Sequence, residues 1–463
     1  MGDLDVLTPL INSQEPSCSQ GFSVIDSSNA WGRLYPENES LKIVDLVKDI
    51  YKVGRQAHDV DCQFTKKCFS TKIMNHISKI HFVITREKLD NKGFIVFITD
   101  TSSNGTYLNG ELIGKNCRWV LSNNDKIAVI SKSNKVYTFT NNNLDNPNFP
   151  MEVRSQLAVY GILGTGTFGE VRLAFGKKTS ECFALKKIKR ESYMAFREHT
   201  ILSSLSHPNI VKMDNFIDAN DAIYICLEYM PGGSLQDLLK QVNTLKETET
   251  KIILYQVARA VQYLHNRSIA HRDLKPGNIL LSLCNPYCQV KLADFGLSKI
   301  VTENTYLKTF CGSLAYLAPE VFVNYKRFSN RLYAYTNKVD SWSFGIILYE
   351  CLAGYKPFSG NNLDAKIQKG SYDLSVLNVS NGVKDLVKKL IMVDYTIRFN
   401  FDQVLDHAWF DKDVLMKRNV SDLIAQFSTS MKTSNKQIKE KENSTKKTRF
   451  CPCLMHTTSS CSM

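Results

Sequence analysis

A glycine-rich stretch, GTGTFGEV (164–171), has the spacing of a loop that brings backbone amides close to phosphate groups. In a dinucleotide-binding fold the same pattern follows a strand and opens a helix. Here two strand-like runs follow it, VRLAF and CFALKKI, so it predicts a hairpin that covers phosphates. Lys186 lies in the second run, where its ammonium could reach those phosphates. Glu198, on a predicted helix, could pair with Lys186, although such a pair in isolation contributes little.

Three further motifs follow in the order and at the spacing of protein kinases: HRDLKPGN (271–278), ADFG (293–296) and LAPE (317–320). A chance match to the whole series is far rarer than a match to one motif. Residues 157–410 therefore resemble the serine/threonine protein kinases over their full length. The resemblance extends to DSWSFG (340–345), where Asp340 would be an internal brace, and to Arg398, which would pair with Glu320 of LAPE. The pattern HRDLKPxN together with CGSLAYLAPE resembles the serine/threonine class rather than the tyrosine class.

The resemblance implies transfer of the γ-phosphate of ATP to a protein hydroxyl, with Mg2+ as the second cofactor. Asp273 would orient the hydroxyl and accept its proton, and Lys275 would stabilise charge on the transferred group. Asn278 and Asp294 would hold Mg2+. Lys186 would hold the α- and β-phosphates. The predicted catalytic set is Asp273, Lys275, Asn278, Asp294, Lys186 and Glu198.

The same resemblance assigns the nucleotide site and its control. The adenine would meet backbone groups of Glu228 and Met230, next to the gatekeeper Leu227. Thr309 and Ser313 are the expected activating phosphorylation sites, although Ser313 could instead line the substrate groove. No essential position is replaced, so we expect an active enzyme; a phosphothreonine adaptor with a scaffolding kinase fold is the alternative. The predicted ATP-binding set is Leu163, Gly164, Thr165, Gly166, Gly169, Val171, Ala184, Lys186, Leu227, Glu228, Met230, Leu280 and Asp294.

Residues 102–110, SSNGTYLNG, hold two Asn-Gly steps between the apolar runs 94–100 and 126–130. Asn-Gly favours a tight hairpin turn, because both residues tolerate a positive φ. Residues 104–106 also fit an N-glycosylation acceptor. The thirteen cysteines are odd in number and form no paired CxxC sets, which indicates reduced intracellular thiols and excludes glycosylation. A hairpin turn and a phosphate-holding loop remain, and the two are compatible.

Two upstream segments favour the phosphate-holding loop. KVGRQ (52–56) and NHISKIHF (75–82) complete the series GR…SxxH…NGTYLN. This series resembles the forkhead-associated (FHA) domains over residues 29–141, which are β-sandwiches whose loops bind phosphothreonine peptides. In that reading His81 and Asn109 brace the loops, whereas Thr106 could brace them or touch the ligand. The predicted phosphothreonine-binding residues are Arg55, Ser78, Lys79 and Asn104.

One FHA domain before one serine/threonine kinase resembles the checkpoint kinase 2 family of DNA damage effector kinases. Ser13 and Ser19 each precede a glutamine, which implies phosphorylation by upstream damage-sensing kinases. The chain contains no Thr-Gln step, so dimerisation through a phosphorylated Thr-Gln is in doubt and a transient homodimer is the expectation. Relatives in this family select arginine three residues before the target and carry acidic residues near the substrate groove. In this chain the matching positions are Ser234 and Gly277. We therefore predict a weaker preference for arginine than the family has, unless Asp237 compensates. For the biological role, a meiotic or replication-specific kinase is the alternative to a DNA damage effector.

The elements that must position these residues fall into two domains. From Trp31 to Thr140, short alternating runs bounded by Gly, Asn, Asp or Ser indicate an all-β sandwich. From Tyr160 onward strands give way to helices, such as 250–266, which carries Ile253, Val257, Val261 and Leu264 on one face. The predicted order is a disordered N-terminus (1–28), the FHA domain (29–141), a linker (142–156), an α+β bilobal kinase (157–410) and a basic, disordered tail (411–463).

The formal net charge is +13, and residues 432–449 carry seven Lys or Arg against two Glu, a local net of 7 − 2 = +5. Such a run is typical of a nuclear-import signal or a nucleic-acid contact. We expect a nuclear protein, with the cytoplasm as a second location, and no direct nucleic-acid binding. No stretch approaches eighteen consecutive apolar residues, so no membrane span is predicted. The expected partners are phosphothreonine-containing proteins, upstream kinases and protein substrates.

Overall fold

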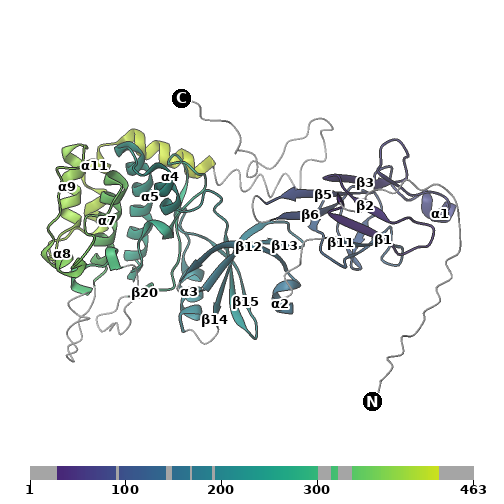
Figure 1. Cartoon of the computed structure of the whole chain (residues 1–463), viewed down its shortest axis with the longest axis horizontal. Coiled ribbons are helices and arrows are strands. Elements are labelled where there is room, and N and C mark those ends of the chain that lie inside the picture. Colours follow the sequence, from purple (N-terminus) through teal and green to yellow (C-terminus); the bar gives the residue numbers. More distant parts are fainter. Residues whose placement is uncertain are drawn as a thin grey trace, which may run out of the picture.

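The computed structural model describes residues 29–89, 93–141, 149–166, 169–189, 193–300, 314–321 and 336–426. Two units follow one another along the long axis of the molecule (Figure 1). The first is a sandwich of strands and the second has a strand-rich lobe followed by a helical lobe. The predicted fold class, an all-β sandwich followed by an α+β bilobal domain, is therefore confirmed.

The sandwich consists of two sheets that enclose one apolar core. The strand orders are β2-β1-β11-β10-β7-β8 and β4-β3-β5-β6-β9, and only β3 and β4 pair in parallel among these strands. Side chains such as Trp31, Phe82 and Phe139 fill the space between the sheets. The elements are β1 (Gly32–Pro36), β2 (Val44–Leu46), β3 (Ile50–Gly54), β4 (Cys62–Gln63), α1 (Thr71–Met74), β5 (Phe82–Lys88), β6 (Phe94–Asp100), β7 (Thr106–Leu108), β8 (Glu111–Leu112), β9 (Arg118–Val120), β10 (Lys126–Val129) and β11 (Lys135–Asn141).

The strand-rich lobe is a five-stranded antiparallel sheet in the order β12-β13-β14-β16-β15, with helix α3 beside it. Register shifts between Val159 and Gly164 interrupt the pairing of the first strand of this sheet, β12, with β13. The elements are α2 (Met151–Arg154), β12 (Leu157–Gly166), β13 (Gly169–Gly176), β14 (Cys182–Lys189), α3 (Tyr193–Ser204), β15 (Met213–Asp218) and β16 (Ala222–Glu228).

The helical lobe is built around α5 and α7. The helix predicted over 250–266 is α5, and its four predicted core residues are all buried, which confirms that periodicity. Helix α7 ends at Gly354, whose φ of 79° suits the left-handed C-terminal cap. The elements are α4 (Leu235–Val242), α5 (Glu247–His265), β17 (Ile269–Ala270), η3 (Pro276–Asn278), β18 (Ile279–Leu281), β19 (Val290–Leu292), β20 (Lys299–Ile300), η4 (Leu314–Tyr316), α7 (Lys338–Ala353), α8 (Leu363–Lys369), α9 (Asn381–Leu390), α10 (Phe401–Leu405) and α11 (Ala408–Asp411).

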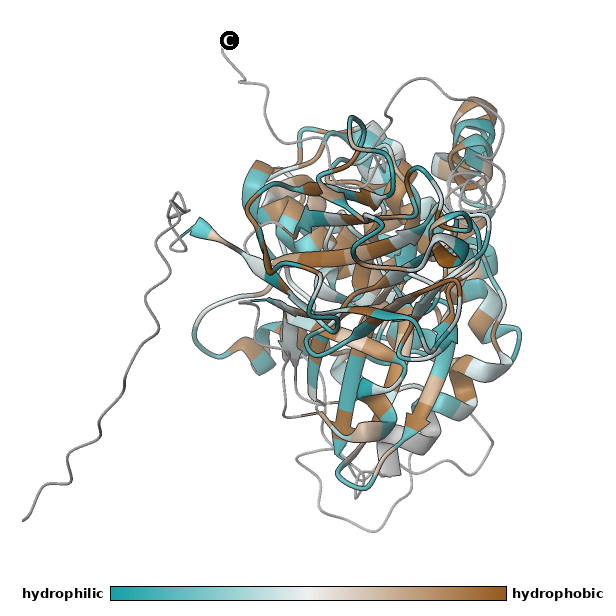
Figure 2. Cartoon of the chain, turned by 90° about the vertical axis from the view of Figure 1, so that its right-hand side faces the viewer, coloured by the Kyte–Doolittle hydropathy of each residue, from teal (hydrophilic) through white to brown (hydrophobic). Residues whose placement is uncertain are grey.

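Hydrophobic residues gather along the strands and on the inward sides of the helices, as the brown segments show (Figure 2). Teal, polar residues lie in connecting loops and also alternate with brown ones along strands and helices (Figure 2). Among the helices of the described residues, none combines the length and the apolar character that crossing a bilayer requires.

Two segments predicted to lie outside the folded domains are partly packed. The packed region continues beyond Phe410, because residues 414–426 are helical and bury Met416 and Val420 in the core of the helical lobe. Their four-residue spacing marks one helix face, which the surrounding charged residues obscure in the sequence. The predicted linker is also packed in its second half, where Phe149 and Val153 join the core of the strand-rich lobe. The predicted N-terminal segment, 1–28, lies outside the described residues.

Candidate active site and phosphate-binding surface

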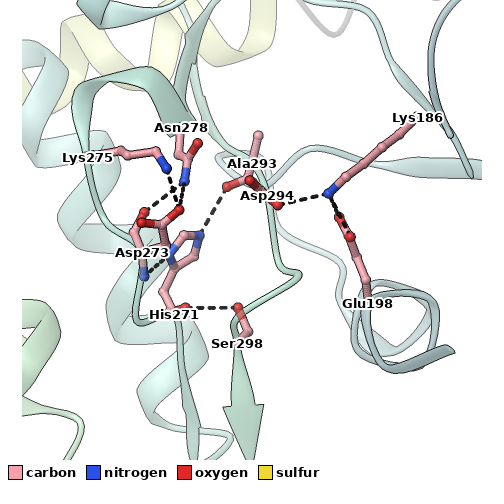
Figure 3. Close-up of polar contacts among 9 residues, drawn as sticks. All are labelled: Lys186, Glu198, His271, Asp273, Lys275, Asn278, Ala293, Asp294 and Ser298. Atoms are coloured by element: carbon pink, nitrogen blue, oxygen red, sulfur yellow. Dashed lines mark hydrogen bonds and ion pairs between the residues drawn. The ribbon is translucent and has the colours of Figure 1, made fainter. Parts of the chain in front are cut away.

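Lys186 lies at the centre of a buried charge cluster between the lobes (Figure 3). Strand β14 carries it and is held on both sides, since Lys186 pairs in register with Val171 of β13 and Ile225 of β16. Its Nζ lies 2.7 Å from both carboxylate oxygens of Glu198 on α3 and 2.8 Å from Oδ1 of Asp294. The predicted pairing of Lys186 with Glu198 is confirmed, and it brings in Asp294 as a third member.

The charge balance of this cluster keeps the lysine ionised. Burial alone would lower the pKa of Lys186, but the carboxylates of Glu198 and Asp294 raise it above its ordinary value. Burial would likewise raise the pKa of Asp294, yet the ammonium of Lys186 lowers it. Burial and the charge of Asp294 together raise the pKa of Glu198. Lys186 therefore keeps its ammonium where phosphates are expected.

Asp273 lies on the loop between β17 and η3, and two side chains fix its carboxylate (Figure 3). Lys275 Nζ donates to Asp273 Oδ2 at 2.6 Å. The amide nitrogen of Asn278 donates to the same oxygen at 3.0 Å and to the carbonyl of Asp273 at 2.8 Å. Asp273 is 5% exposed, so its carboxylate is preorganised on a rigid loop.

The loop that carries Asp273 is itself hydrogen-bonded to two neighbouring segments. His271 Nε2 donates to the carbonyl of Ala293 at 3.1 Å, which joins the Asp273 loop to the segment that carries Asp294 (Figure 3). Asp340, at the start of α7, is fully buried and was predicted to be an internal brace. It accepts the backbone N–H of His271 and of Arg272 and the ring N–H of His265, each at 2.8 Å. The brace is thus confirmed.

The donor set suits a Mg2+ ion shared with a nucleotide. Asn278 uses its amide nitrogen to hold Asp273, which leaves Oδ1 as the atom that can face a metal. Asp294 supplies a carboxylate oxygen on the segment after β19, and its neighbour Ala293 donates its backbone N–H to the carbonyl of Asn278 at 2.9 Å. Mg2+ in such sites takes only one or two protein oxygens and completes its shell with phosphate and water. Within the described residues no cluster of three or more His, Cys, Asp or Glu side chains forms a separate metal cage.

The glycine-rich stretch is the turn of the β12–β13 hairpin, as predicted, with Gly166 opposite Gly169. Gly169 has a φ of 147°, and a Cβ there would lie 1.8 Å from the carbonyl oxygen of Lys187, so only glycine fits. The remaining predicted nucleotide residues lie on strands of both lobes: Leu163, Gly164 and Thr165 on β12, Val171 on β13, Ala184 on β14, Leu227 and Glu228 on β16, Met230 after it and Leu280 on β18.

Sequence reasoning missed an ion pair behind the nucleotide site. The carboxylate of Glu228, at the end of β16, lies 2.9 Å from Nζ of Lys291 on β19. Both side chains are nearly buried, at 13% and 9% exposure. The pair ties the segment expected to meet adenine to the helical lobe. Only the spatial proximity of β16 and β19 could have indicated it, because the two residues lie far apart in sequence.

Other predicted residues fall outside or beside the site. Thr309 and Ser313, and the Ser-Gln serines Ser13 and Ser19, lie outside the described residues. Arg398 is buried and forms the expected fork with Glu320 of LAPE, with N–O distances of 2.8 and 2.9 Å. This pair fixes the end of the segment that follows the phosphorylation sites in sequence.

The predicted phosphothreonine-binding residues converge on neighbouring loops of the sandwich. The backbone N–H of Arg55 donates to the carbonyl of Ser78 at 3.2 Å, and Ser78 Oγ accepts the N–H of Ser103 at 3.0 Å. Asn104 donates its side-chain amide to the carbonyl of His76 at 2.7 Å. The side chains of Arg55, Lys79 and Asn104 are exposed, so charge and hydrogen-bonding groups face outward from three adjacent loops.

The residues expected to brace these loops are buried. His81 accepts the N–H of Ser78 at Nδ1 and donates from Nε2 to the carbonyl of Gly105, and burial lowers its pKa, so its ring is neutral. Thr106 is fully buried and donates from Oγ1 to Asp100 at 2.8 Å. Of the two roles open to Thr106 in the sequence, the structure supports the brace. Asn109 donates to Asp125 at 2.7 Å from a positive φ of 52°.

Comparison with known proteins gives matches over both units. The model described as "Protein kinase domain" matches residues 157–410, and the model described as "FHA domain" matches residues 51–130. The ovarian-specific serine/threonine-protein kinase Lok of Drosophila melanogaster is 35% identical over 428 residues, covering 84% of this chain and 88% of Lok. Serine/threonine-protein kinase cds1 of Schizosaccharomyces pombe is 31% identical, covering 84% and 89%. The crystal structure of Rad53 1-466 in complex with AMP-PNP is 29% identical, with a TM-score of 0.56, and covers 82% of this chain and 99% of that one.

Proposed function

Because this chain belongs to the checkpoint kinase 2 family of serine/threonine protein kinases, we propose that it is an effector of DNA damage checkpoint signalling and cell-cycle arrest. The observation that carries the proposal is that one chain combines an assembled set of predicted catalytic residues with exposed side chains on the predicted phosphothreonine-binding loops. A kinase that responds to other kinases needs both parts, since its FHA domain recognises phosphothreonine that another enzyme has placed.

The catalytic work divides among the residues of the site. Asp273, held by Lys275 and Asn278, accepts the proton of the substrate hydroxyl as that oxygen attacks the γ-phosphorus. Lys275 then lies next to the transferred phosphoryl group, and Lys186 holds the phosphates that stay behind. Mg2+, held by Asn278 and Asp294, would neutralise charge on the phosphate oxygens.

Substrate selection is the part of the site that departs from the family. Asp237 already caps α4, because it accepts Ser234 Oγ at 2.6 Å and lies 3.4 Å from Lys240 Nζ. Ser234 and Gly277 carry no charge. A Cβ on Gly277 would lie 3.0 Å from Oε1 of Gln236, a flexible side chain that can move aside. The enzyme therefore selects arginine three residues before the target only weakly.

A peptide library tests this preference in the parent and in Gly277→Glu, with Gly277→Gln as the uncharged control of equal size. We expect weak arginine selection in the parent and in Gly277→Gln. Gly277→Glu should increase arginine selection near the target by about three- to tenfold, the effect of a new partly exposed ion pair of about 0.7–1.4 kcal/mol. Strong arginine selection by the parent would contradict the assignment.

Regulation and location complete the proposal. Upstream damage-sensing kinases phosphorylate Ser13 and Ser19, Thr309 and Ser313 receive the activating phosphates, and the enzyme acts in the nucleus through its basic tail. Without a Thr-Gln step, any homodimer is transient. The test is phosphosite mapping by mass spectrometry, before and after DNA damage, in cells that carry the parent or Asp294→Ala. Damage-induced phosphate on Ser13 or Ser19, with cell-cycle arrest lost in Asp294→Ala, supports the checkpoint role. Unchanged phosphorylation and normal arrest would favour a meiotic or replication-specific role.

A further inference from the structure

Strand β6 of the FHA domain is apolar on both of its faces. Its run FIVFI turns Val96 and Ile98 into the core of the sandwich. Ile95 and Phe97, which alternate with them, point to the opposite face and are nonetheless 1% and 0% exposed. A sandwich strand whose outer face meets water should alternate apolar and polar residues. The outer face of β6 must therefore be covered.

The cover is the strand-rich lobe of the kinase. Ile95, Phe97 and Val120 of the sandwich share one apolar cluster with Leu173 and Phe175 of β13. The rings of Phe97 and Phe175 meet edge to face, with centroids 6.3 Å apart and planes at 80°. Figure 1 shows the two units adjoining at β6 on one side and β12–β13 on the other. We call this cluster the FHA–kinase junction.

Directional contacts fix the relative position of the two domains at the junction. The backbone N–H of Val120 donates to the carbonyl of Lys177 at 2.8 Å. Ser180 Oγ donates to the carbonyl of Arg118 at 2.7 Å. Lys178 forms an ion pair with Glu111 of β8. The turn after β13 is thus hydrogen-bonded to β9, and the junction is more specific than apolar contact alone would make it.

The kinase face at the junction is the face that also serves the nucleotide. Side chains alternate along a strand, so Leu173 and Phe175 lie on the same face of β13 as Val171. In register beside them on β14 lie Ala184 opposite Leu173 and Lys186 opposite Val171. The FHA domain therefore packs against Leu173 and Phe175, on the same face of the sheet that carries Lys186.

Two further members of the junction cluster flank the nucleotide site. Leu163 directly precedes the glycine-rich turn, and Tyr229 directly follows Glu228. Both pack against the same apolar group as Phe97. The contacts of one FHA strand thus extend to the residues before the glycine-rich turn and after β16.

We propose that the FHA domain is a structural part of the ATP site: through Phe97 and Val120 it holds the β12–β13 hairpin in the position that binds nucleotide. Phe97 and Phe175 act as positioning residues for the kinase reaction, although neither touches the reacting groups. This inference rests on the kinase activity of the chain and adds a function to the FHA domain that is independent of phosphopeptide binding.

The test is steady-state kinetics of the full-length protein carrying Phe97→Ala. Because Phe97 points away from the sandwich core, the substitution leaves that core intact. We expect the KM for ATP to rise about 5- to 10-fold, as when one or two groups must be ordered on binding, with kcat within about twofold of the parent. Phosphothreonine-peptide affinity should stay unchanged. Phe175→Ala should give the same rise, and the double variant should add little to it.

The matched control is Ile98→Ala, one residue away on the opposite face of β6. It should lower the free energy of unfolding of the FHA domain and, at temperatures where the domain stays folded and the junction stays intact, leave the KM for ATP unchanged. An unaltered KM for ATP in Phe97→Ala overturns the inference. If Phe97→Ala loses peptide binding through misfolding, the milder Phe97→Leu decides by the same criterion. A parent protein that transfers no phosphate would instead refute the enzymatic function, so the two failures are distinguishable.

Discussion

Replacing Asp340 by asparagine tests how the catalytic loop is held. The substitution keeps the shape of the side chain and removes its charge. Asp340 accepts three N–H groups at 2.8 Å with its two oxygens and is fully buried. Asparagine offers one acceptor oxygen and one NH2 group, so one end of the side chain must place a donor against a donor. The N–H of Arg272 or those of His265 and His271 then lose their partner.

The expected loss of stability follows from these contacts. A hydrogen bond to a charged acceptor contributes about 1.5–3 kcal/mol, and an unpaired buried donor costs about 1–3 kcal/mol. Together they predict a decrease of about 3–5 kcal/mol in the free energy of unfolding of the kinase domain. In a domain of this size, 3 kcal/mol lowers Tm by about 6–12 °C.

The catalytic consequence is confined to the loop. Arg272 has a φ of 71°, a strained conformation for a side chain other than glycine, and its N–H is one of the groups that Asp340 holds. Once released, this backbone relaxes and displaces Asp273, which follows directly. We expect kcat to fall about 10- to 100-fold, the effect of a misplacement of about 1 Å. The KM for ATP should stay the same, because Lys186 and the β12–β13 hairpin are untouched.

Calorimetry and steady-state kinetics of the full-length protein measure both effects. Asp385→Asn is the control, since that carboxylate also pairs with a histidine, His407, but is 53% exposed and should matter by less than about 1 kcal/mol. The reasoning is refuted if the two variants lose equal stability, or if kcat is unchanged in Asp340→Asn.

The pH dependence gives an independent check on Asp340. Burial would raise the pKa of its carboxyl, but the hydrogen bond and charge of His265 lower it below the ordinary value. A carboxyl with a lowered folded pKa stabilises the protein above its unfolded pKa of about 4, and that stability is lost as the pH falls further. The difference in stability between parent and Asp340→Asn should therefore be full at neutral pH and narrow below about pH 4.

Three further substitutions test other parts of the molecule. Gly169→Ala should raise the KM for ATP about tenfold, because moving the hairpin backbone costs about 1–3 kcal/mol. Glu228→Gln leaves the ammonium of Lys291 unpaired and should cost about 2–4 kcal/mol in urea unfolding, most of which Glu228→Gln with Lys291→Met should recover. Met416→Ala should cost about 2–4 kcal/mol, whereas Val414→Ala, at 74% exposure, should change stability by less than about 0.5 kcal/mol.

The sequence predicted the fold and the pairing of Lys186 with Glu198 because kinase chemistry fixes residue type and spacing together. Phosphoryl transfer needs charges at set positions, and each motif carries one of them. The role of Asp340 as a brace could be predicted for the same reason. Thr106 was not decided by sequence, because a hydroxyl beside an Asn-Gly turn can serve a ligand or a buried carboxylate equally well. Only its burial against Asp100 separates the two roles.

What the sequence could not supply is pairing across distance. Glu228 and Lys291 carry no local signal, since each lies in a strand whose neighbours are apolar. The FHA–kinase junction is partly indicated by the sequence, because the run 94–98 is apolar at every position. That pattern does not identify what covers the outer face of β6. A membrane-facing strand, a dimer interface and an intramolecular contact all produce the same pattern. The partner face on β13 becomes visible only when the chain is folded.

The two ends of the nucleotide site are held by separate structures, and this separation has a kinetic consequence. Asp340 of α7 holds the loop of Asp273 by accepting the backbone N–H of Arg272. Phe97 of the FHA domain holds the β12–β13 hairpin by packing against the apolar cluster on β13. The two supports act on different lobes, the first on the loop that follows β17 in the helical lobe and the second on the β12–β13 hairpin of the strand-rich lobe. Losses at independent sites add in free energy. A double variant, Phe97→Ala with Asp340→Asn, should therefore combine the full rise in KM for ATP with the full fall in kcat. A fall in kcat/KM well short of the product of the single effects would mean that both supports act through one shared movement of the lobes.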